Sequence, residues 1–422
     1  MSSRAAALPF LSLTLACAGR DPSVAAVVPP QTRHAPPSTP ALDPRDELAR
    51  LFAVHDHTAP GPARDALADR IDGLAGQRYA TWSRLYWHRD LDGAIAEARA
   101  TGKPILSLRM LGRLDRDLSC ANSRFFRVAL YANREVSRYL ADHFVLHWSS
   151  ERPVPVARID FGDGRVLERT IAGNSAHYVL DSTGRPVDVI PGLYSPALFV
   201  DALARAYPIA ARAGGLAAPS RAALIADFHR REAARAAERF SQLGAVELAP
   251  GERTASLAEA EGRAMSKAIV EMPVVRSLQL GSQLTLEQAR AWGRATDLWD
   301  QVGAALAARV APSRLDDRSR ALFAALEPAD WARAGQPLPA AGMGALVAAF
   351  EASMTRDAAY NELVLHQQIH ARMAGAPALA LAELNRWVYA SLFLTPAEDP
   401  WLGMATPDTF SGLPRDGLTA GR

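Results

Sequence analysis

Two groups of residues in this sequence have types and spacing suited to chemistry, and the first is built around a single thiol. Cys120 precedes Ser123 by three residues, so on a helix the hydroxyl would lie one turn away and donate a hydrogen bond to the sulfur. A thiol becomes nucleophilic when its pKa is lowered. The only other cysteine, Cys17, lies in an apolar N-terminal stretch that is typical of a targeting segment. An enzyme that cycles through an internal disulfide is therefore excluded.

The second group consists of Glu362, His366 and His370, which follow one another at intervals of four and share one helix face. Two imidazoles one turn apart are suitable ligands for Zn²⁺ or another transition metal. Glu362 would be a third ligand or would orient His366. The zinc-protease motif has a glutamate directly after its first histidine, where this chain has Gln367, so a metallopeptidase is not expected. The alternative is a polar helix face, or core histidines bonded to the backbone.

The run His55-Asp56-His57 is a weaker metal candidate. We expect it in a loop, because Pro60-Gly61-Pro62 interrupts the helical pattern nearby. Its two histidines are two residues apart, and the sequence nearby offers no further metal ligand. This pattern favours a solvated polar turn.

Composition limits the classes of protein to which the chain can belong. Its 422 residues exceed a single core, so two domains with tails are expected. A net charge of +2 gives no indication of a nucleic-acid partner or a polybasic membrane surface. Two cysteines exclude a disulfide scaffold and a cysteine-rich zinc site.

The N-terminus predicts export. In residues 1–18, Arg4 precedes an apolar run that is too short to span a bilayer but matches a secretory signal. The sequence before Cys17 resembles a lipoprotein signal that would lipidate this cysteine, and it also fits a cleavage site that would remove it. Residues 19–46 are rich in Pro and Ala, as a linker would be. We expect a periplasmic or outer-membrane-tethered protein that touches the membrane only through a lipid anchor. The alternative is a disordered cytosolic N-terminus.

Residues 47–213 predict an α/β domain with an N-terminal helical extension over 47–80. Apolar runs and turn residues mark the strands, and apolar spacing of three and four marks the helices. The expected strands are 105–110, 144–148, 156–161, 166–170, 176–180 and 187–190. The expected helices are 90–100, 125–140 with a break at 132–133, and 196–212.

Gly214-Gly215 and Pro219 mark a boundary, after which strand patterns nearly vanish. Residues 219–422 therefore predict an all-α domain with an irregular, Pro- and Gly-rich C-terminal tail. The expected helices are 220–243, 255–275, 285–308, 315–327, 342–374 and 377–393.

The stretch 87–206 resembles the thioredoxin-like domains of exported bacterial proteins. The resemblance covers under a third of the chain, and several separate pieces carry it. These are Trp87, Asp90-Leu91, Gly102-Lys103-Pro104, the Cys120-Ala121-Asn122-Ser123 motif, Tyr131, Val136, Leu140, the turn Asp181 to Arg185, and Gly192. It implies that Cys120 starts the active-site helix, where the helix dipole favours a thiolate.

The chain departs from that family at three places. Ser123 stands where the second cysteine of a Cys-x-x-Cys pair would be. Residues 112–119 form an inserted loop before the motif. The loop before the third core strand, 173–176, lacks the proline that faces the sulfur in the family. Its absence puts binding of a peptide disulfide in doubt.

Three hypotheses for function follow. The first is an envelope protein that exchanges its thiol with protein partners or a low-molecular-weight thiol, a monothiol oxidoreductase with Cys120 as nucleophile and Ser123 as support. The second is a non-enzymatic scaffold or binding protein on a degenerate thioredoxin fold. The third is a metal-binding protein that uses His366 and His370.

Overall fold

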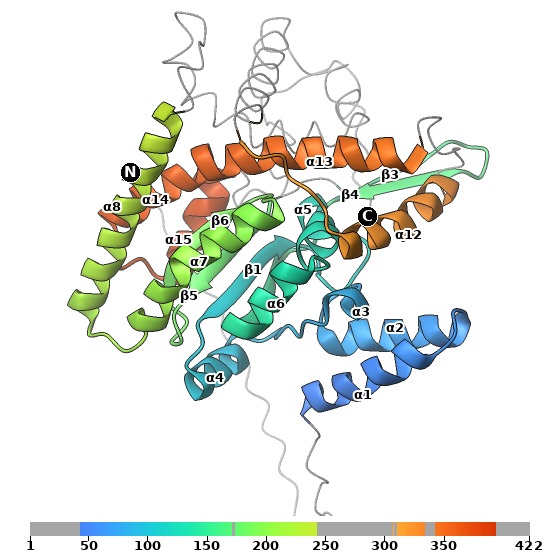
Figure 1. The fold of residues 1–422 in the computed structure, drawn as a ribbon, viewed down its shortest axis with the longest axis horizontal. Coiled ribbons are helices and arrows are strands. Elements are labelled where there is room, and N and C mark those ends of the chain that lie inside the picture. The colour runs from blue at the N-terminus through green and yellow to red at the C-terminus, as the bar shows by residue number, and fades with distance from the viewer. Residues whose placement is uncertain (1–42, 171–173, 243–306, 308–309, 334–341, 394–422) are drawn as a thin grey trace, which may run out of the picture. The chain divides into compact units, whose positions relative to one another are not determined.

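The structure, a computed structural model, describes residues 43–170, 174–242, 307, 310–333 and 342–393 (Figure 1). The described residues do not include the predicted signal with Cys17, the linker up to residue 42, the helix at 255–275, nearly all of the helix at 285–308, or the C-terminal tail. The last residues of the predicted linker, from Pro44, belong to a helix. Among the described residues, no helix is both long and apolar enough to cross a membrane.

A mixed four-stranded sheet forms the centre of the described chain, with strand order β2-β1-β5-β6. Strand β1 pairs in parallel with β2 and antiparallel with β5, and β5 pairs antiparallel with β6. The bounds are β1 Ile105–Leu111, β2 Val145–Arg152, β5 Ala176–Leu180 and β6 Pro186–Pro191. Every residue of β5 and β6 is buried, which explains why these strands are apolar except at His177 and Asp188. The four strands predicted for this sheet are confirmed within a few residues.

Helices cover this sheet because each presents an apolar stripe to it. Helix α7 contacts β5 and β6, and α6 contacts β2; both cross in front of the strands in Figure 1. Helix α4 contacts β1 and β2. The bounds are α4 Leu91–Thr101, α5 Ala121–Phe125, the π-helical turn η1 Phe126–Leu130, α6 Arg134–His143 and α7 Pro196–Ala213. The predicted break at 132–133 is confirmed: the Asn133 side chain caps α6 by accepting from the Val136 N–H at 3.1 Å.

The predicted hairpin around Gly162-Asp163-Gly164 is also confirmed. Strands β3 (Val156–Asp160) and β4 (Val166–Thr170) pair antiparallel as a separate two-stranded sheet. Gly162 and Gly164 both have positive φ, a conformation that glycine adopts without strain.

All of the elements described beyond the predicted boundary are helices. Its elements are α8 Ala218–Gln242, α12 Asp317–Arg333, α13 Gly342–Tyr360, η2 Asn361–Leu365, α14 His366–Gly375, α15 Leu381–Trp387 and η3 Val388–Leu392. Helix α14 packs on α8 and on the edge strand β6. The buried Arg221 on α8 donates to Asp181, in the turn between β5 and β6, at 2.8 Å. These helices therefore complete the core around the sheet.

The N-terminal extension contains α1 (Pro44–His57), α2 (Pro62–Ala75) and α3 (Ala80–Ser83). The prediction of a loop at 55–57 is wrong, because α1 continues through this run to His57 and Thr58 is its C-cap residue. Buried His55 accepts a hydrogen bond from Arg64 Nε at 3.3 Å, and exposed His57 contacts the Ala53 carbonyl at 2.8 Å. Both histidines are thus occupied by helix and ion-pair contacts.

Acid is expected to destabilise this fold through His147 on β2. Burial lowers the pKa of His147 to about 4, and the positive charge of Arg109 acts in the same direction. The neutral ring contacts Ser107 Oγ at 2.8 Å. The unfolded chain takes up the proton near pH 6.5. The contribution of neutral His147 to the free energy of unfolding is therefore fully present above pH 6.5, and it is lost as the pH falls towards about 4. Between pH 7 and 4.5 the loss should reach about 2–3 kcal/mol.

Urea denaturation of wild type and His147→Gln at both pH values tests this expectation. Glutamine does not titrate, so the variant should lose about 2–3 kcal/mol less than wild type over the same interval. Equal losses in the two proteins would contradict the assignment to His147.

Candidate metal centre

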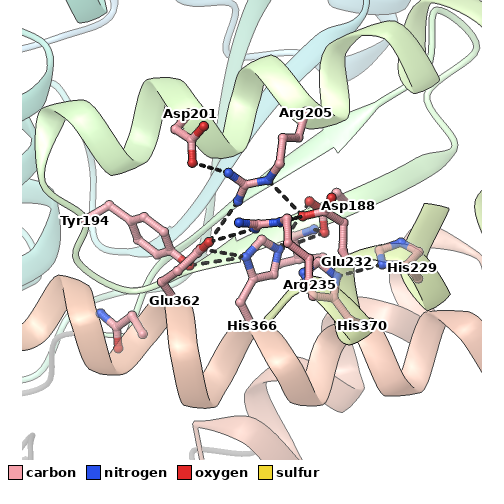
Figure 2. Close-up of polar contacts among 12 residues, drawn as sticks. Asp188, Tyr194, Asp201, Arg205, His229, Glu232, Arg235, Glu362, His366 and His370 are labelled. Atoms are coloured by element: carbon pink, nitrogen blue, oxygen red, sulfur yellow. Dashed lines mark hydrogen bonds and ion pairs between the residues drawn. The ribbon is translucent and has the colours of Figure 1, made fainter. Parts of the chain in front are cut away.

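Three buried ligand groups converge beside the edge strand β6. Asp188 comes from β6, and His366 and His370 come from the first two turns of α14. One ligand atom from each lies within 4.8 Å of the other two, and all three residues are at most 2% exposed. Figure 2 shows them gathered between the strand and α14, with His229 of α8 beside His370. Helix α14 brings its histidines here because its buried face, which includes Ile369 and Met373, packs into the main core.

His366 lies between two carboxylates. Its Nε2 is 3.0 Å from Asp188 Oδ1, and its Nδ1 is 3.2 Å from Glu362 Oε2. Burial alone would lower the pKa of His366, but the two acidic neighbours raise it to about 9. The ring therefore carries both N–H groups and a positive charge in the metal-free protein. The same charge holds the pKa of Asp188 below its usual range despite complete burial.

His370 and His229 form a neutral pair next to the positively charged His366. His229 Nε2 lies 2.9 Å from the Val187 carbonyl, which can only accept, so Nε2 carries the proton of the neutral ring. His229 Nδ1 then accepts from His370 Nδ1 at 2.9 Å. Burial lowers the pKa of His370 to about 2, and the charge of His366 acts in the same direction. This tautomer leaves the lone pair of His370 Nε2 available, which is what a metal ligand requires.

Glu362 is held by positive charges on the other side of His366. Its Oε1 accepts from Arg205 at 2.8 Å and from Arg235 at 3.3 Å, and its Oε2 accepts from the Tyr194 hydroxyl at 3.1 Å. Burial would raise the pKa of Glu362, but His366 and the two guanidinium groups lower it. With both oxygens engaged, Glu362 is poorly placed to bind a metal and well placed to orient His366.

The structure brings Glu362, His366 and His370 together on one buried helix face. The third group within ligand distance of the two histidines is Asp188, which sequence reasoning missed. Asp188 is 178 residues away from His366 in the chain. Its one sequence signal is an acidic residue between Val187 and Val189 in an otherwise apolar strand. A buried carboxylate needs a partner, and that partner is visible only in the tertiary structure.

Cys120 lies at the start of α5, as the sequence predicts for the thiol, and is completely buried. Its Sγ lies 2.9 Å from Ser175 Oγ, in the loop before β5. The expected hydrogen bond from Ser123 to the sulfur is replaced by others. Ser123 Oγ is 2.6 Å from Ser119 Oγ and 2.9 Å from the Cys120 carbonyl, so this hydroxyl stabilises the turn that leads into α5. The hydroxyl beside the sulfur thus comes from Ser175.

The loop before β5, where the resemblance implies a proline, contacts the start of α5 through Ser175. The described residues contain no cis peptide bond. The Asn174 carbonyl accepts from the Tyr389 hydroxyl at 3.2 Å, which ties this loop to η3. Asn385 of α15 accepts from the hydroxyl of Tyr178 on β5 at 2.8 Å, so the last helices are also joined to the sheet.

Fold and site together define an α/β protein with added helices and a buried carboxylate–histidine cluster. No family model matches the chain, and neither the curated proteins nor the solved structures contain a significant match. The argument for function therefore depends on the geometry of the site.

Proposed function

We propose that this protein binds a divalent transition metal, Zn²⁺ in the first place, through Asp188, His366 and His370. The observation that carries the proposal is the convergence of three buried ligand atoms within 4.8 Å of one another. Imidazole and carboxylate are the ligands that zinc takes in three-ligand protein sites. A carboxylate together with two nitrogens also suits zinc better than Ca²⁺ or Mg²⁺, which prefer oxygen ligands alone.

Occupation requires a modest rearrangement. Zinc lies about 2.0–2.2 Å from nitrogen and carboxylate ligands in a tetrahedral site, so ligand atoms that now lie up to 4.8 Å apart must approach to about 3.4 Å. His366 Nε2 and Asp188 Oδ1, now 3.0 Å apart, must separate a little as the metal takes the place of the proton between them. His370 contributes its Nε2 without losing its hydrogen bond to His229.

The surrounding groups support a structural metal. Glu362 fixes the ring plane of His366, and His229 fixes the tautomer of His370. All three ligands are buried, and the described cleft on the surface has none of them in its lining. A metal here would tie α14 to β6 and stabilise the attachment of the helical region to the sheet.

Metal analysis of the purified protein tests the proposal. We expect about one zinc per chain after incubation with Zn²⁺ and dialysis, and loss of this zinc in His370→Ala. The matched control is His57→Ala, which removes an exposed histidine on α1. Circular dichroism checks that His370→Ala is folded. Wild type without stoichiometric metal, or a folded His370→Ala that keeps it, would contradict the proposal.

We further propose that the α/β part has a thioredoxin-like fold. The strand order β2-β1-β5-β6, with one parallel and two antiparallel pairs, supports this, as does the position of Cys120 after β1 and beside the loop before β5. A thiol-exchange role for Cys120 has less support from the geometry, since the sulfur is completely buried. Export and lipid anchoring remain proposals that depend on residues 1–18.

A further inference from the structure

A second candidate site is a cleft of about 700 Å³ on the side of the molecule where α6 and α12 meet the end of α3. It shares no lining residue with the histidine cluster. Four arginines from three parts of the chain line it: Arg84, Arg134, Arg138 and Arg318. Two carboxylates, Glu135 and Asp142, also line it, so positive groups outnumber negative ones.

Two of the arginines are fixed in place. Arg318 on α12 is half-buried and donates to the Ala132 carbonyl and to Ser137 Oγ, both neutral acceptors. Burial lowers the pKa of Arg318, the nearby carboxylate of Asp316 opposes this shift, and the charges of Arg134 and Arg84 reinforce it. Arg84 bonds Asp56 at 2.6 Å. A guanidinium group held by neutral acceptors and facing other cations is a preorganised anion site.

The other two arginines are exposed and available. Arg134 and Arg138 lie one turn apart on α6, and within the described part of the chain the side chain of neither forms an ion pair. Glu135 and Asp142 flank Arg138 on the same helix at spacings of three and four, yet they do not pair with it in this structure. The cleft therefore presents two free guanidinium groups beside two fixed ones.

An aromatic surface adjoins these charges. Tyr139 and His143, both in the lining, stack at 4.2 Å between ring centroids and 17° between planes. Tyr207 meets the edge of His143 at 4.9 Å. A planar group of a ligand can lie against such a surface while its charged groups reach the arginines.

We propose that this cleft binds a small organic phosphate that carries at least two negative charges. Guanidinium groups bind phosphate oxygens in a bidentate fashion, and several of them together neutralise a multiply charged anion. The volume of about 700 Å³ leaves room for an organic part.

Calorimetric titration of the full-length protein at low ionic strength tests this inference with three probes: pyrophosphate, ADP and adenosine. We expect pyrophosphate and ADP to bind with dissociation constants below about 1 mM, ADP more tightly, and adenosine not to bind detectably. Added salt should weaken the binding, because the arginines are exposed.

The double variant Arg134→Ala/Arg138→Ala should bind both phosphate probes at least about tenfold more weakly. Arg99→Ala, which removes an exposed arginine on α4 outside the cleft, is the control and should bind as wild type does. No binding of either phosphate probe at millimolar concentration would overturn the proposal. So would binding that the double variant leaves unchanged, or binding of adenosine as tight as that of ADP.

Discussion

Replacement of Asp188 by alanine is expected to lower the free energy of unfolding by about 3–5 kcal/mol. Asp188 is 1% exposed and its carboxylate contacts His366 Nε2 through both oxygens, at 3.0 and 3.2 Å. Removal of the carboxylate leaves a buried imidazolium facing an empty space. The remaining acidic neighbour of this ring, Glu362, is already shared with Arg205 and Arg235. An unpaired buried charge is among the most destabilising changes that a single substitution can make.

Urea denaturation in the presence of a chelator measures this effect without a contribution from metal binding. The matched control is Asp201→Ala, which also removes an aspartate near the cluster, one that pairs with Arg205 while its side chain is 53% exposed. An exposed pair contributes at most about 1 kcal/mol, so the control should change little. Similar small losses in both variants would contradict the buried ion pair. Asp188→Asn, which keeps the size of the side chain, separates loss of charge from loss of packing.

Alkylation of Cys120 in the folded protein is expected to be at least about a thousandfold slower than in the unfolded chain. The sulfur is completely buried, so a reagent reaches it only when the structure around it opens. Opening of a core segment costs several kcal/mol, and about 4 kcal/mol corresponds to this factor. The sulfur also contacts Ser175 Oγ at 2.9 Å, which fixes its position.

The rate of iodoacetamide labelling with and without urea checks this expectation, and two serine variants locate its cause. Ser175→Ala removes the hydroxyl next to the sulfur and should change the rate in the folded protein more than Ser123→Ala does. A folded protein whose thiol reacts as fast as the unfolded chain would overturn the expectation and favour a working monothiol. A larger effect of Ser123→Ala would restore the role that the motif spacing predicts for this residue.

Local elements follow from the sequence because local rules decide them. The hairpin around Gly162 and Gly164, the start of α6 at Asn133 and the buried strand β1 are each determined by residues that adjoin them. The prediction of a loop at 55–57 is wrong because it placed the end of the first helix too early. The break that was expected before Pro60 falls at Thr58, after the two histidines and not before them.

The sequence by itself determined that His366 and His370 share a helix face, since this depends on spacing alone, and that Cys17 is the one other cysteine in the chain, since this depends on counting. Only the tertiary structure decided what these groups meet. The partner of His366 comes from β6, the partner of His370 from α8, and the hydroxyl beside Cys120 from the loop before β5. Buried polar groups are satisfied by whichever chain segment packs against them, and that segment is chosen by burial of apolar surface over the whole fold.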